Sequence, residues 1–220
     1  MKPIFISGIG TGIGKTLISA VVTEVLHADY WKPVQAGREP ETDAQRVNAL
    51  VSNSTTVIHR ETYIFSLPAS PHIAAKKENV KISLQRIVDD YKKMDPNRPL
   101  VIEGAGGLMV PLNEEEFVID LVKRLDARLV LVSRNYLGSI NHSLMTAALC
   151  RSHGLDVTGW IFNDQYMDYS NDIAGWSGFP ILFSIPALDP ISKHTVAEVA
   201  QRFGEPCRKV LLHGPGHPAE

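Results

Sequence analysis

The sequence has few cysteines, no long apolar run and almost no excess charge. Only two cysteines, Cys150 and Cys207, occur among 220 residues, far apart and outside any C-x-x-C pattern. This usage favours a reducing compartment over a disulfide framework or a zinc site. No apolar run approaches the roughly 18 residues that span a bilayer. A formal net charge of -2 argues against nucleic acid or an anionic membrane as the main partner.

The N-terminus also lacks the pattern of a signal peptide, because only Lys2 precedes an apolar run that leads straight into a glycine-rich loop. We therefore expect a cytoplasmic protein. The composition, 44% hydrophobic and 21% charged, is ordinary for a globular chain, and this length is ample for one large domain. We expect a single domain over residues 1–220, with a frayed tail rich in glycine and proline at 213–220.

Predicted strands and helices alternate along the chain. Short apolar runs typical of buried strands lie at 4–6, 30–34, 100–102, 128–132, 157–162 and 181–185, with a possible last strand at 210–212. Helical patterns occupy 17–26, 41–51, 73–78, 82–93, 117–125, 139–153 and 196–203. The central strands are continuously apolar, which predicts a sheet covered on both faces. The predicted fold class is therefore α/β: a single-domain P-loop NTPase-like fold, mainly a parallel sheet with helices on both faces.

A glycine-rich loop follows the first predicted strand and leads into an apolar helix. It extends from Gly8 to Thr16 and has the form G-x5-G-K-T, one residue longer than the usual P-loop spacing. Its glycines let backbone N–H groups approach phosphate oxygens, and the helix N-terminus adds free donors. Lys15 is expected to reach the β/γ-phosphates, and the Thr16 hydroxyl is expected to bind Mg²⁺. The loop therefore predicts a nucleotide site.

In a parallel sheet, ligands lie at the carboxyl ends of the strands, so residues that follow each strand are candidates for chemistry. Lys32 lies at the end of the second predicted strand, and a second ammonium near Lys15 suits a reaction that builds charge on several oxygens. Glu103 follows the strand at 100–102 and is a candidate ligand for Mg²⁺, which prefers hard oxygen donors. Asp43 is the other candidate, although Thr42 and Asp43 also suit a helix N-cap.

Three later segments have both a functional and a structural interpretation. Gly138 and Ser139 begin a helix whose free N–H groups would bind an anion, or they simply cap it. Asn163 would pair with adenine, or it forms a turn with Asp164. The segment 185–187 follows another strand and would wall the base.

Two histidines are also candidates for chemistry, His72 and His142. A lone histidine is more typical of a structural hydrogen-bonding group than of a catalytic one. We therefore expect structural roles for both.

These motifs together resemble the dethiobiotin synthetase family over nearly the whole chain. Each motif is weak alone, but their order and approximate spacing are specific. In sequence they are the G-x5-G-K-T loop, Lys32-Pro33-Val34, Asp43-Ala44, Ser70-Pro71-His72, Glu103-Gly104-Ala105-Gly106-Gly107, Leu137-Gly138-Ser139-Ile140-Asn141-His142, Gly159-Trp160-Ile161-Phe162-Asn163-Asp164 and Ile185-Pro186.

The resemblance implies an ATP-dependent ligase that forms the cyclic ureido ring of dethiobiotin from 7,8-diaminononanoate and CO₂. One substrate amine forms a carbamate, the γ-phosphate is transferred to that carbamate, and the second amine attacks the carbamic-phosphoric anhydride. The resemblance also implies ATP and Mg²⁺ as cofactors and a homodimer with the substrate at the subunit interface. Neither a nucleic acid nor a membrane is an implied partner.

The same resemblance assigns residues. Lys32, Lys15 and Thr11 would be the catalytic groups, and Thr16, Asp43 and Glu103 would hold Mg²⁺. The nucleotide would be bound by Gly12, Ile13, Gly14, Lys15, Thr16, Leu17, Asp43, Glu103, Gly104, Ala105, Gly106, Asn163, Asp164, Ile185, Pro186 and Ala187. The substrate would meet Lys32, Ala36, Gly138, Ser139, Ile140 and Asn141, assisted by Tyr169 of the other subunit.

The sequence departs from the family pattern at three positions. Gly10 replaces an acid that family loops often carry, and Gly12 stands where some members have Glu. Ala36 replaces a Ser or Thr that contacts the substrate amines. These departures bear on substrate affinity more than on nucleotide binding.

Two other P-loop functions are alternatives. A switch ATPase of the partition or metal-chaperone type often has an additional lysine early in the loop, where this chain has Ile9 and Gly10. An amidoligase of the cobyrinic-acid type normally carries a further glutamine-hydrolysing domain, for which this chain is too short. Both features favour the dethiobiotin synthetase interpretation.

Overall fold

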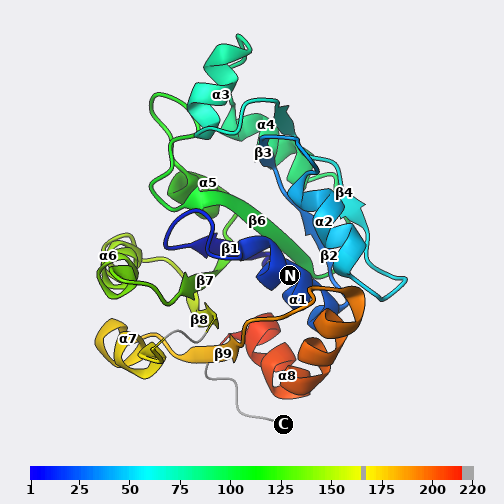
Figure 1. The fold of residues 1–220 in the computed structure, drawn as a ribbon. Coiled ribbons are helices and arrows are strands. Elements are labelled where there is room, and N and C mark those ends of the chain that lie inside the picture. Colours follow the sequence, from blue (N-terminus) through cyan, green and yellow to red (C-terminus); the bar gives the residue numbers. More distant parts are fainter. Residues whose placement is uncertain (165–166, 215–220) are drawn as a thin grey trace.

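A parallel β-sheet forms the middle layer of the molecule (Figure 1). The computed structural model describes residues 1–164 and 167–214. Within them, seven parallel strands pair in the order β4-β2-β6-β1-β7-β8-β9. These strands are β1 (Ile4–Gly8), β2 (Asp29–Trp31), β4 (Ile58–His59), β6 (Leu100–Gly107), β7 (Arg128–Arg134), β8 (Val157–Asn163) and β9 (Ile181–Ile185). A separate small sheet pairs β3 (Val34–Ala36) with β5 (Tyr63–Phe65).

Helices cover both faces of the large sheet. One face carries α1 (Lys15–Leu26), α2 (Asp43–Leu50) and α8 (Lys193–His213). The other carries α5 (Val118–Arg124), α6 (Ser139–Ser152) and α7 (Ser170–Ser177), and its apolar cluster extends to α3 (Pro71–Lys77) and α4 (Leu84–Tyr91). Successive residues of β1 enter opposite clusters, since Phe5 packs on the second face while Ile4 and Ile6 pack on the first. The predicted α/β fold class is confirmed.

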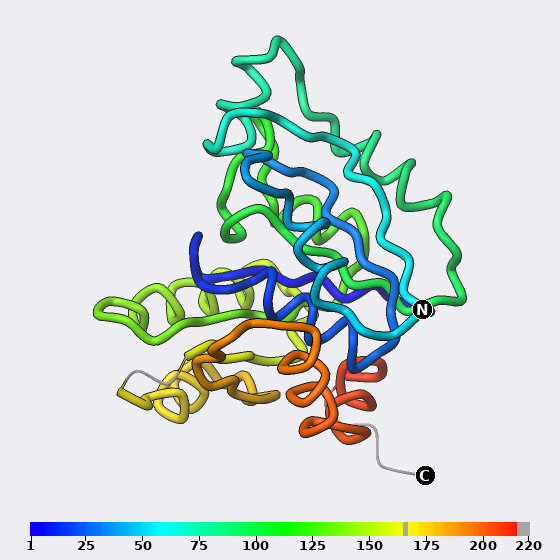
Figure 2. The backbone as a smooth tube through the Cα atoms, turned by 45° about the vertical axis from the view of Figure 1, so that its right-hand side comes forward, coloured from blue at the N-terminus to red at the C-terminus, as the bar shows by residue number. Residues whose placement is uncertain are grey.

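The extent of the strand predicted at 30–34 is wrong. The chain leaves the large sheet after Trp31, and β3 begins a new pairing with β5. Pro33 causes the break because it has no N–H for the ladder, while its carbonyl accepts a hydrogen bond from the Tyr63 N–H at 2.9 Å. The small sheet, α3 and α4 form one end of the molecule, beyond the large sheet (Figures 1 and 2). Lys32 consequently lies at the bend between the two sheets.

The strand predicted at 210–212 is also wrong, because these residues belong to α8. Cys207 and Leu211 are one helical turn apart and both are buried, so the short apolar run is one face of a helix. Gly204 interrupts that helix with non-helical angles (φ 45°, ψ -155°). The frayed tail predicted from 213 begins too early, since His213 is helical; residues 215–220 lie outside the described residues.

In the described part of the chain, every helix is too short or too polar to cross a bilayer. The thiols of Cys150 and Cys207 are free and buried. Burial raises the pKa of each thiol to about 12, so neither forms the reactive thiolate near neutral pH.

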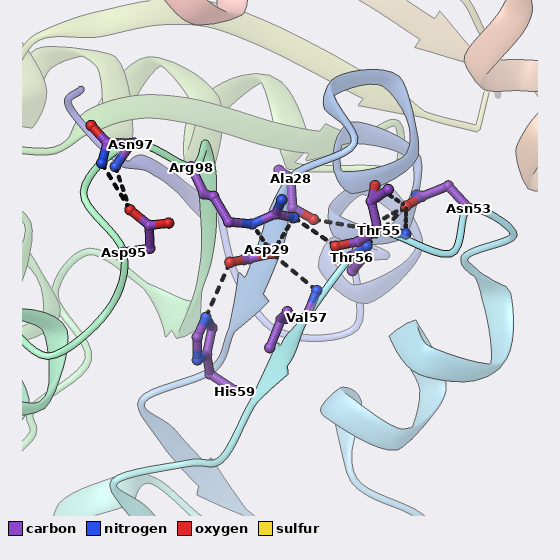
Figure 3. Close-up of polar contacts among 10 residues, drawn as sticks. All are labelled: Ala28, Asp29, Asn53, Thr55, Thr56, Val57, His59, Asp95, Asn97 and Arg98. Atoms are coloured by element: carbon purple, nitrogen blue, oxygen red, sulfur yellow. Dashed lines mark hydrogen bonds and ion pairs between the residues drawn. The ribbon is translucent and has the colours of Figure 1, made fainter.

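A buried carboxylate ties together the segments at the amino ends of β2, β4 and β6 (Figure 3). Asp29 Oδ1 accepts hydrogen bonds from Arg98 Nε at 2.9 Å and Nη2 at 2.6 Å, and from the Val57 N–H at 3.0 Å. His59 Nε2 lies 3.5 Å from Asp29 Oδ2. Burial alone would raise the pKa of Asp29, but the Arg98 and Val57 hydrogen bonds outweigh it and hold that pKa below its ordinary 3.8.

Replacing Asp29 with asparagine is expected to lower the free energy of unfolding at neutral pH by about 2–3 kcal/mol, because charge-assisted hydrogen bonds are lost. The folded-state pKa is depressed, so this stabilisation is fully present above the unfolded-state pKa of 3.8 and is lost as the pH falls further, through the lower folded-state pKa. Urea unfolding over a pH series should therefore show the two proteins converging in acid.

The control for this experiment is Asp126→Asn, which removes an exposed carboxylate from an ion pair with Lys2. Exposed pairs contribute little, so the control should keep the stability of the wild type. Equal stability of Asp29→Asn and wild type at neutral pH would contradict the inference that Asp29 ties these segments together.

Candidate functional site: a cavity beside the glycine-rich loop

The described residues enclose a cavity of about 1130 Å³ beside the glycine-rich loop. Its lining includes residues of β3, of α2 and of the segments 68–71 and 191–193. The loop, the start of α1 and the carboxyl end of β6 line it as well. The cavity thus lies at the carboxyl ends of parallel strands, where such sheets bind ligands.

The glycine-rich loop is shaped to receive an anion. Gly14 is the N-cap of α1 with a φ of 89°, and no side chain caps that helix. The Lys15 side chain folds back over the loop, and its Nζ donates to the Gly10 carbonyl at 2.8 Å. Burial lowers the pKa of Lys15 to about 8, with the Glu103 carboxylate opposing that shift and the Lys32 ammonium adding to it. An anionic phosphate would satisfy this buried ammonium and the uncapped N–H groups.

Replacing Gly14 with alanine is expected to lower the melting temperature, even without nucleotide. The residue has a left-handed φ, which costs an L side chain about 1–2 kcal/mol, and the added Cβ would lie 2.0 Å from Asn163 Nδ2. Gly12→Ala is the matched control, because Gly12 has a φ of 74° but nothing within 4 Å of the added Cβ. Thermal unfolding should show a larger loss for Gly14→Ala. Equal losses of melting temperature in the two variants would mean that the close approach to Asn163 does not affect stability.

The Lys32 ammonium lies in a cluster of four polar side chains at the inner wall of the cavity; two of them contact it, and the other two contact those carboxylates. The Lys32 ammonium pairs with Asp43 Oδ2 and with Glu103 Oε1, the latter at 2.9 Å. The Thr16 hydroxyl lies 2.8 Å from Asp43 Oδ1 and 3.1 Å from Glu103 Oε1. The Tyr30 hydroxyl donates to the other Glu103 oxygen at 2.9 Å. The three residues predicted to hold Mg²⁺ are therefore brought together, with the predicted catalytic lysine among them.

The charges in this cluster are mutually stabilising. Burial would lower the pKa of Lys32, but Glu103 and Asp43 raise it above its ordinary value. Burial would raise the pKa of Asp43, but Lys32 lowers it below the ordinary value. The described residues hold no group of three or more His, Cys, Asp or Glu side chains that would cage a metal by itself. Two carboxylates and a hydroxyl do fit Mg²⁺ bound together with a nucleotide, because the phosphates supply further oxygens.

The capping interpretation at the start of α2 applies to Thr42 alone. The Thr42 hydroxyl accepts from the Gln45 N–H at 3.2 Å, and the Thr42 N–H donates to Gln45 Oε1 at 2.8 Å. This reciprocal pair satisfies the helix start. The Asp43 carboxylate is consequently left to face Thr16 and Lys32.

The segments predicted to bind the base are only partly on the cavity. Asn163 lines it, but its Nδ2 already donates to the Ile13 carbonyl at 3.0 Å. Asp164 turns away and pairs with Arg134 at 3.1 Å on a second hollow of about 450 Å³, which Thr11, Gly12 and Ile13 also line. Gly104 packs against Phe5, whereas Ala105 and Gly106 do line the main cavity.

The segment 185–187, expected to wall the base, does not line this cavity, and its contact with the base stays a prediction. Ile185 is fully buried in the core beneath α8, and Pro186 and Ala187 are not among the lining residues. The cavity is lined instead by Arg46 and Leu50 of α2 and by Ile191, Ser192 and Lys193. No periodicity or motif indicated these residues; only the proximity of α2 to the segment before α8 reveals them.

The residues at the start of α6 that were predicted to bind the substrate do not line the cavity of their own chain. Gly138 is the N-cap, with a φ of 102°. The Ser139 hydroxyl lies 2.8 Å from the Tyr169 hydroxyl, which also donates to the Tyr136 carbonyl at 2.9 Å. Tyr169, expected to act from another subunit, is thus bonded within its own chain. The segment 138–141 and Tyr169 are absent from the cavity lining.

Ala36 and Gln35 of β3 also line the cavity. Gln35 Nε2 donates to the Gly37 carbonyl at 2.8 Å, and the Asp43 N–H donates to Gln35 Oε1 at 3.4 Å, so its amide is held in place. The two candidate histidines make structural contacts. His72 Nδ1 lies 3.0 Å from the Ser70 hydroxyl, and His142 Nδ1 lies 2.8 Å from the Tyr136 hydroxyl.

Comparison with known proteins gives a consistent family. A family model described as an AAA domain matches residues 2–195. The ATP-dependent dethiobiotin synthetase BioD of Christiangramia forsetii is 47% identical over 203 residues, covering 92% of this chain and 96% of that protein. The protein of the same name from Cytophaga hutchinsonii is 43% identical over 205 residues, covering 92% of this chain and 97% of its own length.

Solved structures show the same fold at lower identity. A ParA family ATPase from Chlorobium tepidum TLS matches with a TM-score of 0.60 and 19% identity, covering 96% of this chain and 98% of that one. At this identity the likeness concerns the fold alone. It therefore carries no argument for a partition function.

Proposed function

This chain belongs to the AAA-domain family and, within it, to the ATP-dependent dethiobiotin synthetases; from that premise we propose how its residues perform the reaction. The protein is an ATP-dependent ligase that synthesises dethiobiotin in biotin biosynthesis. The observation that carries the assignment of residues is the meeting of Lys32, Thr16, Asp43 and Glu103 in the cavity that Lys15 also lines.

In this proposal the substrates are 7,8-diaminononanoate, CO₂ and ATP. One amine adds to CO₂ and loses a proton, giving a carbamate. A carbamate oxygen then attacks the γ-phosphorus, and ADP leaves. The second amine attacks the carbonyl of the resulting anhydride, so that the ureido ring closes and phosphate departs. Carbamate and γ-phosphate are both anionic, so the protein must hold two like charges together.

Two lysines offset that repulsion. Lys15 binds the β/γ-phosphates together with Thr11 and the free N–H groups at the start of α1. Lys32 contacts the carbamate and the transferring phosphoryl group, where charge grows during the reaction. The closeness of both lysines to Glu103, which shifts the pKa of each, supports their joint action in one site.

Mg²⁺ is the second cofactor in this proposal, held by Thr16, Asp43 and Glu103. When bound, it supplies positive charge that neutralises the phosphate oxygens. The donor set supports it, since a hydroxyl and two carboxylates already surround a cationic group. Lys32 shares these carboxylates, so in the loaded enzyme its ammonium turns from them toward the substrate anions.

The end of the cavity at β3 and the segment 68–71 receives the diamine in this proposal, with Ala36 beside it. The substrate carboxylate is bound at Gly138, Ser139, Ile140 and Asn141 of another subunit in a homodimer. The absence of these residues from their own chain's cavity supports a contribution to a neighbour. We place the enzyme in the cytoplasm, where ATP is supplied.

The test is a coupled assay in which each substrate is omitted in turn. Phosphate release from MgATP is expected only when diaminononanoate and bicarbonate are present together, with one dethiobiotin formed per phosphate. ATP hydrolysis at the same rate with and without the diamine would instead indicate a switch ATPase. The family relationship and the absence of a further lysine early in the loop favour the ligase.

A further inference from the structure

Glu103 uses its two oxygens for different purposes. Oε1 faces the cavity, 2.9 Å from Lys32 Nζ and 3.1 Å from the Thr16 hydroxyl. Oε2 points into the protein and accepts the hydroxyl hydrogen of Tyr30 at 2.9 Å. Only 1% of Glu103 and none of Tyr30 is exposed, so no bulk water competes for that inner contact.

Tyr30 is held rigidly on the strand beside Glu103. It lies on β2, opposite Val101 of β6, and its ring belongs to the apolar cluster that packs under α1 and α8. Tyr30 and Lys32 are two residues apart, and Glu103 is two residues beyond Val101, so strand alternation brings these side chains to one face of the sheet. The phenol approaches from the core while the ammonium approaches from the cavity.

A carboxylate that is free to rotate would lose orientation entropy on binding a cation, and it would present either oxygen. A partner on one oxygen fixes the plane of the carboxylate and the oxygen that remains available. Phenol donation to Oε2 leaves Oε1 as the cavity-facing donor beside Thr16 and Asp43. The contact also satisfies an oxygen that would otherwise be buried without a partner.

We propose that Tyr30 is a positioning residue that holds Glu103 as a one-oxygen ligand for the Mg²⁺ bound with ATP. This inference rests on the proposed function, which assigns Glu103 to the metal. Tyr30 contacts neither substrate nor metal in this account and acts only through Glu103.

The test compares Tyr30→Phe with wild type by the affinity for Mn²⁺ in the presence of ATP, measured from the electron paramagnetic resonance signal of free Mn²⁺. Loss of such an orienting partner commonly weakens metal affinity by about 10- to 100-fold, and we expect a loss in this range. The Mg²⁺ concentration for half-maximal dethiobiotin formation should rise similarly. Binding of ATP without metal should stay unchanged, which a general structural defect would not allow.

Thr23→Val is the matched control, because it also removes a buried hydroxyl from the core on this face. Thr23 Oγ1 makes no hydrogen bond within the described residues, so Mn²⁺ affinity should equal that of wild type. Phenylalanine keeps the ring of Tyr30 in place, and thermal unfolding with ATP binding verifies that both variants are folded. Should Tyr30→Phe be too unstable for titration, Tyr30→Met offers another side chain without a hydroxyl.

Glu103→Gln separates this inference from the proposed function. Wild-type Mn²⁺ affinity in Tyr30→Phe, together with a loss in Glu103→Gln, would overturn the role of Tyr30 and leave the metal assignment standing. Wild-type affinity in Glu103→Gln would overturn both. A loss in Tyr30→Phe and Glu103→Gln, with none in Thr23→Val, is the result that supports the proposal.

Discussion

Replacing Lys32 with alanine is expected to lower the rate of dethiobiotin formation by about 10²- to 10³-fold while ATP still binds. That range is typical when one group that stabilises developing charge is removed. The loss should appear mainly in kcat, because Lys15 and the glycine-rich loop retain the phosphates. Steady-state assays of product and calorimetric titration with ATP measure the two effects separately. Near-normal turnover in Lys32→Ala would contradict the catalytic assignment.

The same substitution has a stability effect with a separate cause. It leaves Asp43 and the 1%-exposed Glu103 without their cation, and breaking such a buried pair commonly costs about 3–5 kcal/mol. Assays therefore belong well below the melting temperature. Lys32→Arg keeps the positive charge and should retain more stability, yet its planar fork does not reproduce a compact ammonium, so turnover should remain low. Lys81→Ala, at an exposed lysine, is the neutral control.

Replacing Lys15 with methionine is expected to weaken ATP binding by about 10- to 100-fold. Hydrogen bonds from a charged donor are worth about 1.5–3 kcal/mol, which corresponds to that range. The fold itself should tolerate the change, because burial already disfavours the Lys15 ammonium, whose pKa is lowered to about 8. Titration should therefore show a lower affinity for ATP, while thermal unfolding without ATP should show a melting temperature that is not lowered.

Lys77→Met, on the exposed end of α3, is the control for general effects of removing a lysine. Wild-type ATP affinity in Lys15→Met would show that the phosphates bind elsewhere. A large loss of stability of Lys15→Met without nucleotide would instead contradict the inference that the Lys15 ammonium is unfavourably buried until a phosphate binds.

Much of this site could be predicted because parallel sheets concentrate chemistry at one edge. Lys32, Glu103 and the glycine-rich loop each follow an apolar run, and the carboxyl ends of parallel strands share an edge of the sheet. A shared edge was therefore predictable from the parallel sheet, whereas the strand order that makes these residues neighbours came only from the structure. Asp43 was harder, since its neighbour Thr42 offered an equally good cap, and only the three-dimensional contacts separate the two residues.

Other features depend on contacts that local sequence does not encode. The pairing of β3 with β5 joins residues far apart in the chain, so the strand at 30–34 was extended past the Pro33 bend. The helix α7 was not predicted because its buried positions include Ser170 and Ser177, which carry no apolar pattern. The short apolar run at 210–212 is compatible with either strand or helix until its packing is known.

The contact between Tyr30 and Glu103 is an intermediate case. Tyr30 of β2 lies two residues before Lys32, which directly follows that strand, so alternation places both on one face, and this signal was present in the sequence. What the sequence lacked was the alignment of β2 beside β6, which decides what that face meets. The part of the cavity lining at 191–193 had no such signal.

The central claim is that Thr16, Asp43 and Glu103 hold a divalent cation over the phosphates that Lys15 and Lys32 contact. Crystals grown with Mn²⁺ and a non-hydrolysable ATP analogue test it directly, because anomalous scattering locates the metal independently of the model of the protein. The account predicts one strong peak coordinated by these three side chains, with both lysines on phosphate oxygens. A peak elsewhere, or Lys32 turned away from the phosphates on the opposite side of the cavity, would contradict it.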